Sequence, residues 1–400
     1  MLSAEQLLAE LLKRARPLDE TEVVNLDGAL GRVLGKGVVS SVTVPPLDNS
    51  AMDGYAVRIA DVQVGVPMWV SQRITAGRVG QWLQSGTAAR IFTGAPIPPG
   101  ADAVVMQEGA ILEGEEVRFP VVPRLGQHIR RAGEDIAAGC EVLCPGTRLG
   151  AAELGLAASA GAASLGVVRR LKVAIFSTGD ELAEPGEPIN PGQIYNSNRY
   201  TLTGLLQGLN ADLRDFGRVP DSLDATVRTL EQAADWADVV VTSGGVSVGE
   251  EDHVKAALEK LGRLEMWKVA MKPGKPLVYG RVSDADFIGL PGNPVSVFAT
   301  FCLFARPFLL QRMGATRVLY RAFPLKAAFD WPRAGERREF LRGLMVPDAN
   351  GGSAVRLYPN QSSGVLTSAT WGDGFVDIAV GQTVVRGEWV RFIPFSEVLG

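Results

Sequence analysis

The densest group of polar side chains in the chain follows two consecutive prolines, at residues 48–57. Two aspartates, an asparagine, a serine and a tyrosine occur within these ten positions, which include Asp53 and Gly54. Packing does not require such a composition, and a glycine lets a ligand approach the backbone closely. The segment therefore predicts a surface that holds an anion or a metal-bound anion.

A glycine-rich segment follows a predicted buried strand and opens a predicted helix. Gly244 and Gly245 let backbone amides approach an anion, and Ser243 and Ser247 add hydroxyl donors. The segment lacks the lysine of a P-loop and does not match the dinucleotide fingerprint. It predicts an anion cradle of another kind, in which Asp252 either caps the next helix or helps to coordinate Mg²⁺.

Three lysines, Lys268, Lys272 and Lys275, fall within eight positions around prolines and a glycine. This arrangement favours a fixed positive wall for a phosphate or another oxyanion, although a solvated basic loop is the alternative. Pro291 and Pro294 follow at the start of a long predicted helix, where Pro294 suits the first helical position. Free amides at that helix start would add to the same anion site.

Weaker candidates lie in other turns. In the first predicted strand–helix turn, Ser177, Thr178 and Gly179 can present hydroxyls and amides to a phosphate, and Glu181 can hold a hard cation or orient a hydroxyl. A helix cap by the neighbouring Asp180 is the alternative. Earlier in the chain, a threonine, two arginines and an aspartate repeat this theme, although each alone is typical of a surface turn: Thr93, Arg130, Arg131 and Asp135.

The composition limits the classes of protein and of chemistry. With 400 residues, 46% hydrophobic and 21% charged, the chain is globular and too long for one ordinary domain. A net charge of −4 without a basic stripe disfavours nucleic-acid binding. Three cysteines favour a reducing compartment, here the cytoplasm, and two histidines leave little room for imidazole chemistry. No secretory signal is visible, and we expect no membrane span, because no run approaches about 18 apolar residues.

The elements that must position these residues follow from local patterns. Ser3 and Gln6 form a capping box that opens a helix to about residue 14, and a second short helix is expected at about 26–34. Glycine and proline punctuation at 38–141 predicts a compact β domain with many turns, and a helix is expected at about 151–160. A β region, barrel-like, begins near residue 319.

Between these β regions, strands alternate with helices. Such alternation predicts a parallel sheet with helices on both faces and a ligand site beyond the carboxyl ends of the strands. The strands are expected at 172–177, 211–218, 238–242, 265–271, 277–279 and 287–290, and the helices at 197–208, 222–236, 252–261 and 294–313, the last kinked at Pro307.

In this order along the chain, the motifs resemble those of the molybdopterin molybdenumtransferase family (MoeA in bacteria, the E domain of gephyrin in animals). The resemblance spans essentially the whole chain, and residues 360–364 match more loosely. It implies a multi-domain α/β plus β fold with four parts. These are a helical linker (1–44 and 138–167), a Gly/Pro-rich β domain (45–137), a parallel-sheet α/β molybdopterin-binding domain (168–318) and a C-terminal β-barrel-like domain (319–400).

The resemblance also implies a reaction, in which molybdenum from molybdate enters adenylylated molybdopterin and AMP leaves with the help of Mg²⁺. It implies a homodimer whose site lies between the α/β domain of one subunit and the β domain of the other. Its implied partners are a transient molybdopterin adenylyltransferase and apo-molybdoenzymes or their chaperones. Residues implied in catalysis are Asp53, Glu181, Asp221, Asp252, Lys268 and Lys272, with Glu181, Asp221 and Asp252 as metal ligands.

Further residues are implied in substrate binding: Thr93, Arg130, Asp135, Ser177, Thr178, Gly179, Ser243, Gly244, Gly245, Ser247, Lys275, Pro291, Pro294 and Ser363. Lys272, Lys275 and Arg130 would neutralise the molybdate dianion, and Asp53 and Glu181 would position metal, water or pterin. Three other readings remain open, namely a molybdopterin-binding module without transferase activity, a gephyrin-like scaffold and a nicotinamide-mononucleotide deamidase-type protein. A bare binding module would not need residues 48–57 and 93–98.

Overall fold

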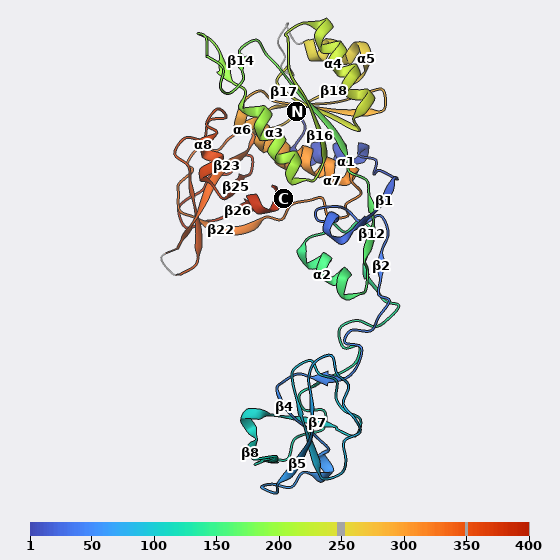
Figure 1. Ribbon diagram of the computed structural model, residues 1–400. Helices are drawn as coiled ribbons and strands as arrows, with labels where there is room; N and C mark the ends of the chain where they lie inside the picture. The colour runs from blue at the N-terminus through green and yellow to red at the C-terminus, as the bar shows by residue number, and fades with distance from the viewer. Residues whose placement is uncertain (246–252, 349–350, 400) are drawn as a thin grey trace.

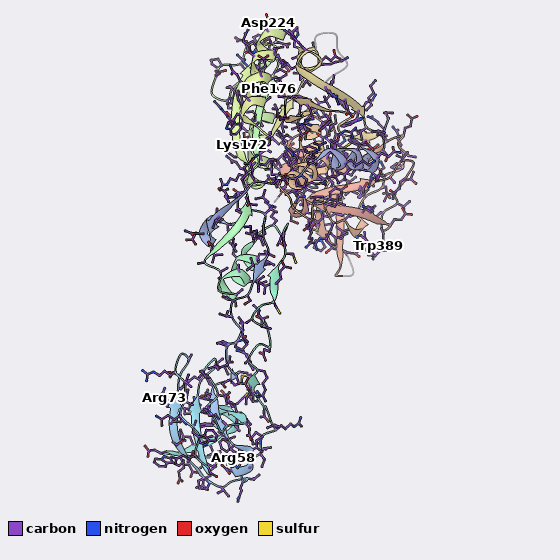
Figure 2. All side chains as sticks on the ribbon, turned by 90° about the vertical axis from the view of Figure 1, so that its right-hand side faces the viewer. Arg58, Arg73, Lys172, Phe176, Asp224 and Trp389 are labelled. Atoms are coloured by element: carbon purple, nitrogen blue, oxygen red, sulfur yellow. The ribbon has the colours of Figure 1, made fainter. Side chains whose placement is uncertain are left out.

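A computed structural model describes residues 1–245, 253–348 and 351–399. Figure 1 shows a body, which contains both termini, and an arm that extends away from it. In the perpendicular view of Figure 2, a narrow neck joins the two, with Arg58 and Arg73 on the arm and Trp389 on the body. The chain is therefore elongated.

The N-terminal helix α1 (Ala4–Arg14) begins as predicted. Ser3 accepts a hydrogen bond from the Gln6 amide, and the Gln6 side chain accepts one from the Ser3 amide. The helix that was predicted at about 26–34 is wrong, because only a 3₁₀ turn (Leu26–Gly28) forms there. Gly31 has a φ of 75°, which is outside the helical range, and the next residues join β-bridges instead.

The linker between body and arm consists of short antiparallel pairs. Strand β1 (Thr21–Asn25) pairs with β12 (Ser164–Val168), and β2 (Val38–Val39) pairs with β11 (Glu141–Leu143). A helix, α2 (Ala151–Ser159), covers them, close to its predicted position. The chain thus leaves for the arm after β2 and returns before β11, so the arm is an insertion into the linker.

The arm contains a six-stranded sheet and a small strand pair. The sheet order is β7 (Ala103–Met106), β4 (Gly54–Val57), β6 (Thr87–Ile91), β5 (Met68–Ile74), β9 (Glu116–Arg118) and β8 (Ile111–Glu113). Beside it, β3 (Asn49–Ser50) pairs with β10 (Ile129–Arg130). All four residues of β4 are buried, which places the end of the polar segment 48–57 in the centre of the sheet.

The α/β part of the body contains a six-stranded sheet. Its parallel strands are β16 (Asp212–Val219), β13 (Lys172–Thr178), β17 (Val239–Ser243) and β21 (Ala285–Leu290). Next to β21, strand β20 (Pro276–Val282) and the edge strand β18 (Gly262–Lys268) continue the sheet with antiparallel pairing, so the sheet is mixed. Seven residues separate β18 from β20 and two separate β20 from β21, which is too short for the helical crossover that parallel neighbours need.

Helices cover both faces of this sheet, as predicted. On one face, α4 (Leu223–Trp236) and α5 (His253–Leu261) pack on Phe176, Val240 and Phe287. On the other face, α3 (Ser197–Gly208) and the long helix at residues 294–312 pack on Val173, Ile175 and further apolar residues. Successive residues of a strand belong alternately to the two apolar clusters, because side chains of a pleated sheet point to opposite faces in turn.

The long helix comprises α6 (Pro294–Thr300), a π-helical turn (Phe301–Ala305) and α7 (Arg306–Arg312). The wider π turn lies just before Pro307, whose missing amide cannot continue an α-helical ladder. These 19 residues are long and apolar enough to cross a membrane, contrary to the expectation from the sequence. Because 89% of the apolar window is buried inside the protein, this helix is the core of the body.

The C-terminal region is a closed barrel of five strands, in line with the barrel-like prediction. In order they are β23 (Arg338–Pro347), β24 (Ser353–Leu357), β22 (Phe323–Ala327), β26 (Trp389–Pro394) and β25 (Gly374–Ile378), which returns to β23. A short helix, α8 (Thr367–Trp371), and a strand from the α/β part, β19 (Met271–Lys272), join it.

Aromatic contacts fix the barrel against the α/β part. Phe298 of α6 lies 5.2 Å from Phe395 and 5.8 Å from Phe375, measured between ring centroids. These residues belong to the same buried cluster as the sheet face described above. The barrel is therefore packed beside the carboxyl ends of the strands. The four domain boundaries given above remain a prediction.

Candidate active site

The carboxyl ends of three neighbouring strands bring three of the predicted loops together. In the sheet register Ser177 of β13 lies opposite Ser243 of β17, which lies opposite Leu290 of β21. The loops that follow these residues contain Gly179 and Glu181, Gly244 and Gly245, and Pro291 to Pro294. Parallel neighbours thus gather segments that are more than 100 residues apart in the chain, as expected for an open α/β sheet.

The glycine loop after β17 has a backbone that only glycine adopts easily. Gly244 and Gly245 have φ values of 88° and 62°. A Cβ atom on Gly245 would lie 2.6 Å from Cγ2 of Val254 and 2.9 Å from Oγ1 of Thr178. The loop therefore lies tightly against β13 and α5. The predicted ligands Ser247 and Asp252 lie outside the described residues.

A cavity of about 790 Å³ lies between these loops and the barrel. Seven of the residues predicted from the sequence line it: Glu181, Gly244, Gly245, Lys272, Lys275, Pro291 and Ser363. Ten further residues line it that the prediction did not include: Ile194, Pro273, Gly274, Pro276, Gly292, Asn293, Ser296, Arg337, Gln361 and Ser362. Both lysines and Arg337 are cationic and Glu181 is the one acid among these residues, so the lining favours an anion.

The positive wall is built by the turn between β19 and β20. Gly274 has a φ of 99°, and a Cβ atom there would lie 2.5 Å from Cγ2 of Thr300, so the turn packs directly on α6. Lys272 lies 3.5 Å from Glu339, between Nζ and Oε2, and about half of its side chain is exposed. Lys268, the third lysine of the prediction, is exposed at the end of β18 and does not line the cavity.

The barrel contributes the opposite wall through residues 361–363, which a buried arginine holds in place. Arg342 is fully buried and donates to the Ser362 carbonyl at 3.1 Å and to Oγ of Ser368 at 2.9 Å. Burial lowers the pKa of Arg342 to about 10. Gln361 exchanges hydrogen bonds with the Arg342 backbone, and the Val295 amide donates to the Ser363 carbonyl at 2.9 Å. The loop is thereby tied to the start of α6.

A two-stranded flap covers the side of the cavity that contains Glu181. Strand β14 (Leu182–Ala183) pairs with β15 (Ile194–Tyr195), and the Ile194 amide donates to the Glu181 carbonyl at 2.8 Å. Arg218 donates to the Leu182 carbonyl. The backbone of Glu181 is thus fixed, while its side chain is exposed to the cavity.

Several predicted residues lie near the cavity without lining it. Ser177, Thr178 and Ser243 are buried at the strand ends beneath it, and Pro294 is the first residue of α6. Asp221 follows the edge strand β16, with Oδ1 3.9 Å from Nε2 of His253. Within residues 1–245, 253–348 and 351–399, no three acidic, histidine or cysteine side chains form a metal-binding group.

The predicted residues of the arm form a separate polar surface. Asp53 accepts hydrogen bonds from the amide and the hydroxyl of Thr93, both at 2.8 Å, and the amide first and the hydroxyl second hold the pKa of the Asp53 carboxyl below its usual range. Arg130 and Asp135 are exposed, and Arg130 pairs with Asn49 in the β3–β10 strand pair. Figure 1 shows the arm well apart from the α/β part and the barrel. A single chain therefore does not bring Asp53 to the cavity.

The first acid of the polar segment supports this surface. Asp48 accepts from the Ala132 amide at 2.8 Å and from Arg131 at 2.5 Å, and these contacts, the amide first, lower the pKa of Asp48. Arg131 is thus engaged within the arm, whereas the Arg130 side chain has no hydrogen-bond or ion-pair partner among the described residues. Asp48 joins the segments 48–57 and 130–135 into one surface.

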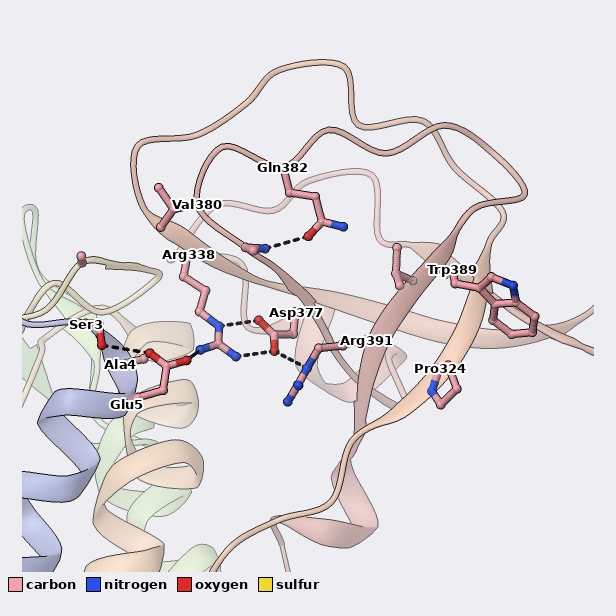
Figure 3. A pocket seen from close by; sticks show the side chains of 13 residues that line it. Ser3, Ala4, Glu5, Pro324, Arg338, Asp377, Val380, Gln382, Trp389 and Arg391 are labelled. Carbon is pink, nitrogen blue, oxygen red and sulfur yellow. Dashed lines mark hydrogen bonds and ion pairs between the residues drawn. The ribbon is translucent and has the colours of Figure 1, made fainter.

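A second cavity, of about 480 Å³, lies between α1 and the barrel and was not foreseen (Figure 3). Arg338 donates to both carboxylate oxygens of Asp377 at 2.6 Å and also to Glu5 of α1. Arg391 donates to Asp377 at 3.1 Å. These ionic contacts connect the N-terminal helix to the barrel, so the charged groups here have a structural role.

Known protein families match this chain over nearly its whole length. Three family models match: the MoeA N-terminal region (domain I and II) at residues 2–161, a probable molybdopterin binding domain at 174–311, and the MoeA C-terminal region (domain IV) at 324–395. The matches extend through the arm and the barrel, which a lone molybdopterin-binding module lacks.

Relatives and solved structures agree with these matches. A molybdopterin molybdenumtransferase from Haemophilus influenzae is 39% identical over 100% of both chains. One from Nostoc sp. is 36% identical over 95% of this chain and 89% of its own. A molybdopterin biosynthesis MoeA protein from Pyrococcus horikoshii OT3 has a TM-score of 0.82 at 30% identity, covering 98% of this chain and 100% of its own.

Proposed function

The chain belongs to the molybdopterin molybdenumtransferase family and acts in molybdenum cofactor biosynthesis, and from this premise we propose the reaction that its cavity performs. The cavity binds adenylylated molybdopterin and molybdate, molybdenum is inserted into the dithiolene, and AMP is released. The dithiolene sulfurs belong to the substrate, so the protein needs no cysteine ligand. The observation that carries the proposal is the cationic cavity at the strand ends.

Charge complementarity supports binding of both substrates. Lys272, Lys275 and Arg337 line the same cavity and can neutralise the molybdate dianion and the diphosphate of the adenylate. The backbone of Gly244 and Gly245 allows a phosphate to approach closely. Catalysis then rests on placement and electrostatic stabilisation of the bound substrates.

A magnesium ion is part of the proposal. Mg²⁺ is commonly bound by one or two carboxylates together with substrate phosphates and water, and Glu181 offers one such carboxylate in the cavity lining. Asp221 and Asp252 are the other candidate ligands. Bound there, the ion would neutralise charge on the diphosphate that is cleaved when AMP leaves. The flap fixes the backbone of Glu181 through its carbonyl, which would place the carboxylate beside such an ion.

We further propose that a homodimer completes the site. Asp53 is kept ionised by its contacts with Thr93 and presents a carboxylate on the arm, apart from the cavity of its own chain. A second copy can bring its arm to this cavity, and a two-fold axis would then generate two equal sites. In this arrangement Asp53, Thr93, Arg130 and Asp135 would face the bound substrates from the partner side.

The proposal includes a cytoplasmic location and transient partners. All three cysteines are free, which fits a reducing compartment. A molybdopterin adenylyltransferase would supply the adenylate, and apo-molybdoenzymes or their chaperones would receive the product. The substrates of both exchanges are anionic small molecules, for which a transient contact around the cavity suffices.

The decisive experiment measures AMP released from adenylylated molybdopterin. Release should require both molybdate and Mg²⁺, and the absence of AMP with both present would overturn the proposed reaction. Lys275→Gln should abolish the reaction, because it removes a cation from the cavity. Lys260→Gln, an exposed position in the last turn of α5, is the matched control and should behave like the unaltered protein.

A further inference from the structure

The charged residues at the start of β23 lie between the two cavities described above. Arg337 lines the large cavity, and Arg338 lines the second cavity, where Figure 3 shows it directed towards Asp377. Glu339, the next residue, lies on the same side of the strand as Arg337, next to Lys272. Successive side chains of a strand point to opposite faces, so this alternation follows from the strand itself. The barrel therefore contributes an acid, as well as a cation, next to the anion site.

Glu339 is placed by backbone pairing. In the parallel pair of β19 and β23, Lys272 lies opposite Glu339, and Met271 lies opposite Arg338. Only about a tenth of the Glu339 side chain is exposed. Within the part of the chain that the structure describes, its buried Oε2 atom has no hydrogen-bond donor, and the Lys272 ammonium lies 3.5 Å from it. A buried carboxylate in this situation depends on the nearby cation.

This pair affects an anion in two ways. The carboxylate restrains Lys272, whose long side chain is otherwise free to take many rotamers. It also opposes the binding of a second negative group on the far side of the same ammonium, because like charges repel over several ångströms in a partly buried site. Glu339 thus lowers the affinity of the cavity for an anion and at the same time fixes the position of the Lys272 side chain.

We propose that Glu339 is a positioning residue that fixes Lys272 and keeps the affinity for the substrate oxyanion low enough for exchange. This inference rests on the proposed function of the cavity. The competing explanation is a purely structural ion pair between β19 and the barrel. The two explanations predict different changes in anion affinity when the carboxylate charge is removed. The proposed role predicts a gain in affinity, whereas a structural ion pair predicts none.

The test is equilibrium binding of molybdate alone to the full-length protein. Glu339→Gln should bind molybdate about tenfold more tightly, because it removes a negative charge beside the bound dianion. Glu339→Asp, which keeps the charge, should stay within about twofold of the unaltered protein. Glu397→Gln is the matched control, since Glu397 is also a largely buried acid paired with an arginine in the C-terminal region, outside the cavity.

Unchanged or weaker molybdate binding by Glu339→Gln would overturn the inference. If that variant does not fold, Lys272→Gln replaces it. That change leaves Glu339 uncompensated, and it should therefore reduce molybdate affinity at least tenfold more than Lys275→Gln does. Equal losses in the two lysine variants would count against the inference.

Turnover separates this inference from the proposed function. In AMP release, Glu339→Gln should lower the KM for molybdate and also lower kcat, because Lys272 is less well placed and the anion leaves more slowly. A protein that binds molybdate with the predicted order of affinities but never releases AMP would contradict the proposed reaction and leave the role of Glu339 intact.

Discussion

Mixing two inactive variants tests whether the arm of one subunit completes the cavity of another. Asp53→Ala removes the carboxylate of the arm, and Lys275→Gln removes a cation of the cavity. Each homodimer should be inactive, because both of its sites lack an essential group. Asp53 is exposed to solvent around its Thr93 contacts, so the first substitution should leave the fold intact.

The expected recovery follows from symmetry. When the variants are mixed in equal amounts and subunits exchange freely, half of the dimers contain one copy of each. Such a dimer has one site with both changes and one with neither, because the intact arm of one copy meets the intact cavity of the other. About a quarter of the unaltered activity should therefore return.

AMP release after co-expression, with the mixed dimer verified by mass spectrometry, measures this recovery. As a control, Lys275→Gln mixed with Lys272→Gln should recover nothing, because both changes lie in the same half of the site. If verified mixed dimers of the first pair stay inactive, or if the protein is a monomer in solution, the shared site is refuted.

Three further predictions concern the fold and its ionised groups. Asp377→Ala should lower the free energy of unfolding by about 1.5 to 3 kcal/mol, since it removes the charge-assisted hydrogen bonds from Arg338 to Asp377, while Arg338 keeps its contact with Glu5; a loss below about 1 kcal/mol in urea denaturation would contradict this. Thr93→Val should raise the pKa of Asp53 by removing the hydroxyl donor, so the acid-side loss of activity should move to higher pH, and an unchanged carboxyl titration by NMR would argue against the contact. Ser3→Ala should cost about 1 kcal/mol through the lost cap of α1, whereas Ser3→Asp should retain the stability measured in the same assay.

Features that depend on neighbouring residues were predictable from the sequence. The capping box at Ser3 and Gln6, the strand–helix alternation and the helix at 197–208 all follow from local spacing, and the structure confirms them. The loops after β13, β17 and β21 were foreseen for the same reason, since each directly follows a buried strand. Their meeting at one edge then follows from parallel pairing.

Features that depend on distant residues were not predictable. The barrel closes through β23 and β25, and this closure brings Arg337 and Gln361 to the cavity from a region without a clear motif. The run at 360–364 was the one signal, and it pointed to Ser363. The short helix at 26–34 failed because Gly31 turns the chain and the following apolar residues gain partners near residues 148 and 167.

The double connection of the arm has a consequence for how this chain can be rearranged. The chain enters and leaves through adjacent residues, since Val44 forms a bridge with Ile136 beside the β2–β11 pair. The two apolar clusters of the arm contain only residues from 55–129, so none of its core comes from the body. The arm is thus a self-contained insertion whose two ends lie side by side, and replacing it with the arm of a relative should leave the remaining cores undisturbed.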